Sequence, residues 1–110
     1  MAEHEDALED FERALQRRPQ QVYRLRLYIT GASRSSLQAI ANLKQFCRQY
    51  LEGRYELEVI DLYQQPELAH LEQLMVAPTL VRASPLPVRR LIGTLSNQQE
   101  VMRLLDVVSS

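Results

Sequence analysis

The chain has 110 residues, of which 45% are hydrophobic and 25% charged, the composition of one ordinary globular domain with a single core. Its formal net charge of −1 excludes a strongly basic protein that holds nucleic acid or an anionic membrane by overall charge. No apolar run reaches the roughly 18 residues of a membrane span, and the acidic N-terminus is unlike a targeting signal. The single cysteine, Cys47, excludes an internal disulfide and fits a reducing compartment, so we expect a cytoplasmic protein.

Residues 1–20 differ in charge from the rest of the chain, because acidic side chains predominate there. Leu8, Phe11 and Leu15 recur at the spacing of one helical face, and Pro19 ends the pattern. We therefore expect an N-terminal helical appendage over 1–20 and one folded domain over 21–110.

The domain begins with an expected strand, turn and helix. Apolar and polar residues alternate over 22–30, which predicts a strand with one polar side. Gly31 opens a polar turn in which Ser35 or Ser36 is placed to cap the next helix. Gly53 is placed to end that helix.

A second strand and a second helix are expected next. The run over 55–62 predicts a strand parallel to the first, joined to it by a right-handed crossover. Pro66 suits the first position of a helix. Leu71 and Met75 belong to the predicted apolar face of this helix, which we expect to continue until Pro78 breaks it.

A hairpin and a last helix complete the predicted α/β order, β-α-β-α-β-β-α. Residues 79–83 and 88–92 are expected as antiparallel strands around the stiff turn Ser84-Pro85-Leu86-Pro87. Ser96 followed by Gln99 is a capping-box pattern, which predicts the start of the final helix.

This order resembles the thioredoxin fold, with a polar turn after one strand and a proline opening a later strand. In that fold the turn carries two redox cysteines, whereas residues 31–36 contain none. A thioredoxin-like scaffold that lacks the cysteine pair indicates a protein that binds a partner and does not catalyse a redox reaction. By the same resemblance, we expect the peptide bond before Pro78 to be cis.

No residue type or spacing in the chain indicates catalysis. Cys47 falls within a predicted helix, far from any strand-to-helix turn, so we interpret it as a structural thiol. His4 and His70 are far apart, and no acidic or cysteine cluster accompanies them at metal spacing. Glycine-rich phosphate-binding patterns are absent. We expect no catalytic residue, no metal and no cofactor.

The remaining signal is the basic set Arg82, Arg89 and Arg90, which the predicted hairpin brings into one neighbourhood. One interpretation is a solvated basic edge that discourages strand pairing. The other is a docking patch for an acidic protein surface.

Five segments of the chain resemble the KaiB family of circadian clock proteins. They are Leu25-Arg-Leu-Tyr-Ile-Thr-Gly31, Tyr55-Glu-Leu-Glu-Val-Ile-Asp61, Gln65-Pro-Glu-Leu-Ala69, Ala77-Pro-Thr-Leu80 and Pro85-Leu-Pro-Val-Arg-Arg-Leu-Ile-Gly93. They occur in the family's order, and the resemblance spans about residues 23–108.

The resemblance implies a non-enzymatic protein that binds the ATPase ring of KaiC, a RecA-like protein, competes there with the sensor domain of SasA and helps sequester KaiA. It also implies a metamorphic fold. Residues from about 64 to 108 either complete a monomeric thioredoxin-like form, which binds KaiC, or adopt a β-α-β-β-α-α-β form that assembles into tetramers. The implied partner-binding residues are Glu67, Arg82, Arg89 and Arg90, and the implied fold-switch positions are Pro78, Gly93, Thr94 and Ser96.

Two departures from the family pattern bear on these expectations. Thr94 stands where the family usually has Asp and, with the Ser96 and Gln99 cap, this favours the last helix and the thioredoxin-like state. One cap contributes about 1 kcal/mol, and two folds of one sequence differ by only a few kcal/mol. Glu58 and Gln73 replace expected lysines, which weakens the docking charge and indicates a diverged KaiC homologue and a stress-related role.

Two other functions stay open at this point. A sensor module that works with a histidine kinase would prefer a kinase to an ATPase ring. A thiol enzyme that uses Cys47 alone would require a reactive thiolate in the native protein.

Overall fold

The computed structural model of the chain describes residues 22–74 and 76–106. Within them the elements are β1 (Tyr23–Ile29), α2 (Arg34–Tyr50), β2 (Tyr55–Asp61), α3 (Pro66–Leu71), β3 (Thr79–Ser84), β4 (Arg89–Ile92) and α4 (Gln98–Leu105). This is the predicted order β-α-β-α-β-β-α, in its thioredoxin-like form. The helix expected over 1–20 lies outside the described residues.

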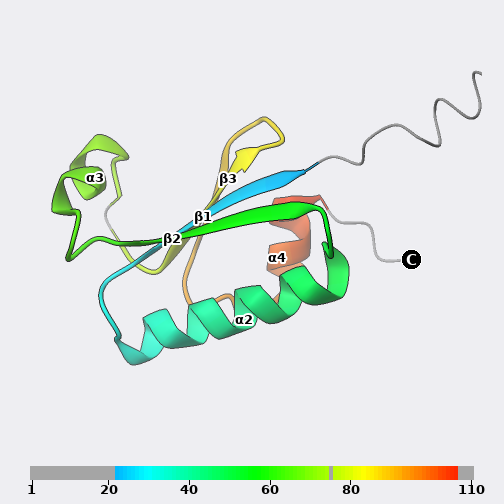
Figure 1. The fold of residues 1–110 in the computed structure, drawn as a ribbon, viewed down its shortest axis with the longest axis horizontal. Helices are drawn as coiled ribbons and strands as arrows, with labels where there is room; N and C mark the ends of the chain where they lie inside the picture. Colours follow the sequence, from blue (N-terminus) through cyan, green and yellow to red (C-terminus); the bar gives the residue numbers. More distant parts are fainter. Residues whose placement is uncertain (1–21, 75, 107–110) are drawn as a thin grey trace, which may run out of the picture.

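The strands form one mixed sheet in the order β2-β1-β3-β4. β1 and β2 are parallel, as the strand-helix-strand spacing predicted, and α2 makes the connection between them. β3 runs antiparallel to both β1 and β4, so the predicted hairpin is present. In Figure 1, α2 and α4 lie below the strands, and α3 lies above them at the left-hand end.

Alternating side chains of β1 supply two apolar clusters. Leu25 and Leu27 belong to the larger cluster, which also contains buried residues of α2 and α4. Tyr28 belongs to a smaller cluster with Ile60 and Val81, against which apolar residues of α3 pack. Because successive side chains of a strand point to opposite faces, the sheet is packed by α2 and α4 on one face and by α3 on the other.

The helix starts differ from those predicted by one to three residues. Ser33, not Ser35 or Ser36, caps α2, because the Ser36 main-chain N–H donates to the Ser33 hydroxyl at 3.3 Å. Asn97, not Ser96, caps α4, since its side-chain oxygen accepts from two main-chain N–H groups of the first turn. In each case a neighbouring polar side chain reaches the free amides of the first turn.

The prediction that α3 continues to Pro78 is wrong, because α3 ends at Leu71. Gln73 adopts a left-handed conformation with φ 54°, which stops the helix. Leu71, expected on the apolar face, is 71% exposed. Further along the chain, the Ala77–Pro78 peptide bond is cis, as predicted.

Candidate partner-binding site

The turn that would carry redox cysteines in a thioredoxin is held here by hydroxyl and carboxylate groups. The Ser33 hydroxyl donates to Ser36 Oγ at 2.8 Å, and the Thr30 main-chain N–H donates to Ser36 Oγ at 3.2 Å. Asp61 Oδ1 accepts from the Gly31 main-chain N–H at 2.9 Å. These groups are engaged in ordering the turn, which supports the structural interpretation of its serines.

Cys47 lies in the middle of α2 and is fully buried in the larger apolar cluster. Burial raises the pKa of its thiol from 9.0 to about 12. Only the thiolate is nucleophilic, so this side chain is inert near neutral pH. This geometry opposes a thiol enzyme based on Cys47.

Arg82, expected to be a surface contact, is fully buried. Its Nη1 atom donates to Leu104 O and to Asp106 Oδ2, each at 2.8 Å, and its Nη2 atom donates to Pro87 O at 2.9 Å. The guanidinium therefore ties β3 to the end of α4 and to the hairpin turn. Arg82 is unavailable as a docking residue in this structure, a correction to the expected patch.

The partner of Arg82, Asp106, was missed by the sequence reasoning. Its side chain is 66% exposed, and it lies 24 residues further along the chain. The hydrogen bond from Arg82 is the main cause that lowers the pKa of the Asp106 carboxyl below its ordinary value, and the charges of Arg82 and Arg89 act in the same direction. The only available hint was the alternating side-chain direction along β3, which puts Arg82 on the same face as the buried Leu80.

Arg89 and Arg90 are both exposed, but they belong to opposite faces of the sheet. Arg89 pairs with Arg82, and Arg90 pairs with Val81. Directly paired residues of antiparallel strands share a face, so Arg89 lies on the α4 side and Arg90 on the α3 side. The three arginines therefore do not form one patch, although the hairpin does bring them close in register.

The surface around α3 combines exposed apolar groups with charge. Glu67 is exposed in the first turn of α3. Arg90 donates to the main-chain oxygens of Glu72 and Gln73, which connects β4 to the segment after α3. Exposed large apolar residues of α3, its flanking loops and β4 are Tyr63, Leu71, Val76 and Ile92. This set, with Glu67 and Arg90, is called the α3–β4 surface below.

The expected fold-switch positions lie near one another where β3 begins and β4 ends. The Gly93 main-chain N–H donates to Pro78 O at 2.9 Å, and Gly93 has φ 118°, a conformation that suits glycine. Asn42 of α2 donates to Thr94 O at 2.9 Å. The hydroxyls of Thr94 and Ser96 lie 3.2 Å apart. The segment before α4 is thus tied to β3 and to α2.

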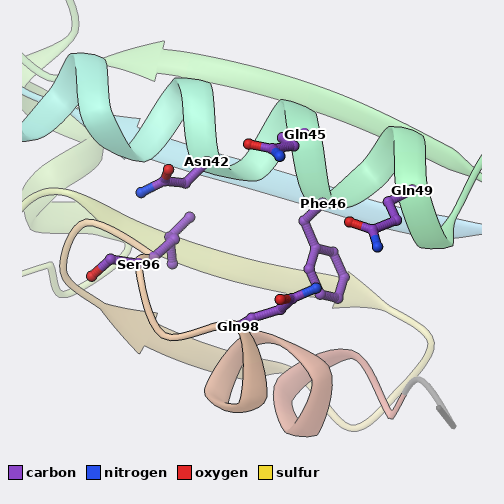
Figure 2. A pocket seen from close by; sticks show the side chains of 7 residues that line it. Asn42, Gln45, Phe46, Gln49, Ser96 and Gln98 are labelled. Atoms are coloured by element: carbon purple, nitrogen blue, oxygen red, sulfur yellow. The ribbon is translucent and has the colours of Figure 1, made fainter.

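A small pocket lies between α2 and the loop that leads into α4 (Figure 2). Figure 2 shows the amide side chains of Asn42, Gln45 and Gln49 on α2, with Gln98 on the facing helix and the Phe46 ring between them. Gln98 donates to the Tyr50 hydroxyl at 2.6 Å. The lining has no charged group and no histidine, so the pocket offers no general acid or base, and the Ser96 hydroxyl in it has no base to activate it as a nucleophile.

The described part of the chain offers neither a metal site nor a membrane span. Among residues 22–74 and 76–106, no three His, Cys, Asp or Glu side chains are grouped so that they could bind a metal ion. No helix of these same residues is long and apolar enough to cross a membrane.

The geometry defines a class: a thioredoxin-like domain that lacks the redox cysteine pair and exposes an apolar and charged surface. Solved structures share its fold. The N-terminal domain of Synechococcus elongatus SasA matches with a TM-score of 0.65 at 24% identity, covering 78% of this chain and 85% of that one. Chloroplastic thioredoxin z matches with a TM-score of 0.62 at 19% identity, covering 89% and 88%.

Sequence comparison identifies the family. Residues 26–107 match the family model described as KaiB domain. The chain is 48% identical over 84 residues to circadian clock protein KaiB3 of Synechocystis sp., covering 76% of this chain and 82% of the relative. It is 39% identical over 90 residues to the circadian clock oscillator protein KaiB of Synechococcus elongatus, covering 82% and 88%. The chain belongs to the KaiB family, and the names of these relatives, which describe clock components, agree with the prediction that it is not an enzyme.

Proposed function

We propose that this chain is a non-enzymatic adaptor that binds the ring of a KaiC-like, RecA-family ATPase and modulates its signalling. The observation that carries the proposal is the form of residues 66–105, which are arranged as α3-β3-β4-α4. By the family resemblance, this thioredoxin-like arrangement is the one that binds KaiC. Membership of the KaiB family over residues 26–107 supports the same partner class.

The proposed contact is the α3–β4 surface. Exposed apolar residues such as Leu71 and Ile92 supply area that gains from burial, while Glu67 and Arg90 supply orientation. Arg89 extends the charged rim on the other side of β4. Arg82 is left out of the proposed contact because its guanidinium is buried and used inside the domain.

The experiment mixes the purified protein with the KaiC homologue of the same genome and ATP, followed by native mass spectrometry. The proposal expects rings that carry one adaptor per ATPase subunit. Leu71→Asp should abolish the complex, because it places a charge in the apolar part of the α3–β4 surface. The matched control is Leu37→Asp, since Leu37 is also exposed, at 54%, but lies on α2. Absence of the complex in the wild type, or equal loss with both variants, contradicts the proposal.

The alternative function is a sensor module that acts with a histidine kinase. The binding experiment must distinguish it from the adaptor. The fold is shared with the SasA N-terminal domain, and this likeness concerns the fold alone. Binding to a kinase, with no complex on the ATPase ring, would select the sensor module. KaiA-like or SasA-like proteins are proposed as further partners that meet the adaptor at the ring.

The thioredoxin-like form is proposed to prevail over the β-α-β-β-α-α-β form, from which a homo-oligomer would assemble. The Asn97 cap and the Asn42 hydrogen bond to Thr94 both stabilise the start of α4. Sedimentation analysis should find a monomer, and a tetramer would contradict this part. Residues 1–20 are proposed as a helical appendage to the 21–110 domain, and the adaptor is proposed to act in the cytoplasm.

A further inference from the structure

The segment that follows α3 forms a complete helix-ending motif. The Leu74 main-chain N–H donates to Ala69 O at 2.8 Å, and the Gln73 main-chain N–H donates to His70 O at 3.1 Å. Gln73 has a left-handed φ of 54°. This is the Schellman arrangement, in which glycine is usual at the left-handed position because other side chains are strained there. A glutamine at this position needs support from its surroundings.

α3 has little else to hold it in place. It has six residues, none of which is fully buried, and its N-terminal cap residue, Gln65, makes no side-chain hydrogen bond to the helix. A helix this short is unstable in water without tertiary contacts. Its apolar anchorage comes from Leu68 and Ala69, which are only partly buried against the smaller cluster.

Arg90 supplies the missing support from a neighbouring strand. Its Nη1 atom donates to Gln73 O at 3.2 Å, and its Nη2 atom donates to Glu72 O. Both acceptors are main-chain oxygens at the end of α3, which the helix itself leaves without partners. The planar guanidinium presents two donors in a fixed fork, so one side chain holds two successive peptide units.

We propose that Arg90 is a positioning residue: it fixes the end of α3, and through α3 it shapes the α3–β4 surface, instead of serving chiefly as a charge that touches the partner. The expected effect of Arg90 on partner binding rests on the proposed function, whereas its effect on the position of α3 does not. Arg90 then affects partner binding by fixing the main chain at Glu72 and Gln73. A positive charge without the two hydrogen bonds would therefore not replace Arg90.

Arg90→Lys separates these two roles, because lysine keeps the charge but lacks the planar fork. Hydrogen exchange of the free protein is measured at the amides of Glu72, Gln73 and Leu74. The proposal expects exchange there to accelerate about tenfold, as for the loss of one charge-assisted hydrogen-bonded contact. Arg89→Lys is the matched control, next to Arg90 on β4 but on the opposite face, and should leave these amides unchanged.

A second variant tests the mechanism. Gln73→Gly relieves the left-handed strain while keeping the main-chain oxygens that Arg90 binds. In the Gln73→Gly background, Arg90→Lys should accelerate exchange less than in the wild type, and this coupling is the signature of a shared motif. Equal acceleration in both backgrounds would overturn the link between Arg90 and the strain.

The two assays distinguish failure of this inference from failure of the proposed function. Unchanged exchange in Arg90→Lys would overturn the positioning role, whether or not the ATPase binds. Faster exchange together with about tenfold weaker ring binding supports the inference in full. Faster exchange with undiminished ring binding would overturn the link from α3 to the partner. If the wild type binds no ring, the proposed function fails, and the exchange result still decides the role of Arg90.

Discussion

Replacing the buried Arg82 by methionine tests how much its hydrogen bonds contribute to stability. Arg82→Met keeps a long unbranched side chain but removes the donors to Leu104 O and Pro87 O. The buried Leu104 carbonyl left without a donor costs about 1–3 kcal/mol, whereas Pro87 is exposed, so water can hydrate its carbonyl and the loss there is smaller. Asp106 loses its partner too, but its carboxylate is 66% exposed and is hydrated by water.

One contribution opposes this loss. Arg82 Nε is buried and has no hydrogen-bond partner within the described structure, and the buried cation is itself costly to desolvate. The variant removes both penalties. Weighing about 1–3 kcal/mol for the Leu104 carbonyl and a smaller loss at Pro87 against them, we expect Arg82→Met to lower the free energy of unfolding by about 1–3 kcal/mol.

Urea denaturation followed by circular dichroism measures this difference. The control, Arg89→Met, removes an exposed arginine from the position that pairs with Arg82, and should change stability by less than about 0.5 kcal/mol. In Arg82→Met, hydrogen exchange should accelerate more at the amides of α4 than at those of α2, because Arg82 bonds the end of α4. A variant as stable as the wild type, or more stable, would refute the reasoning and show that the arginine is no better here than an apolar side chain.

Three further predictions follow from individual groups. Because the folded-state pKa of Asp106 is lowered, its stabilising contribution is present above the ordinary carboxyl pKa of 3.8 and is lost as the pH falls through the folded-state value. An NMR titration of the Asp106 carboxyl should show this lowered pKa, and Arg82→Met should raise the pKa. Cys47, with a pKa of about 12, carries about one thiolate in 10⁴ molecules at pH 8, so alkylation should be slow in the native protein and fast in urea; rapid native alkylation would revive the thiol enzyme. Gly31→Ala should destabilise the protein by about 1–2 kcal/mol, since Gly31 has φ 60° and a Cβ there would lie 3.0 Å from the Tyr63 ring; adding Tyr63→Ala should relieve only the contact, and urea denaturation of both variants measures the two parts.

The strands and helices of this protein are determined largely by local sequence. Alternation over 23–29 makes β1 a strand, and the spacing between β1 and β2 requires a crossover, which α2 provides. Gly53, in a left-handed conformation, marks the turn after α2 that the Arg54 N–H closes onto Leu51 O, although the residue that caps the helix is Leu51 and not Gly53. These features depend on neighbours within a few residues, so the sequence alone predicts them.

The absence of a redox cysteine pair from the turn is also evident in the sequence, since residues 31–36 contain no cysteine. The helix caps are less certain from sequence because several polar residues near each helix start are chemically suited to the role. Ser33 and Asn97 are the capping residues because their backbone is extended, which lets each side chain accept from main-chain N–H groups of the first helical turn.

The three arginines of the hairpin show what only the tertiary structure decides. In the sequence they are equivalent cations, yet Arg82 is fully buried, Arg89 is exposed on the α4 side, and Arg90 holds the end of α3. Their roles depend on strand register and on acceptors far along the chain, such as Asp106. Local propensity contains no information about contacts across such separations. The early end of α3 has the same origin, because the left-handed Gln73 is held by tertiary contacts that no helical periodicity reveals.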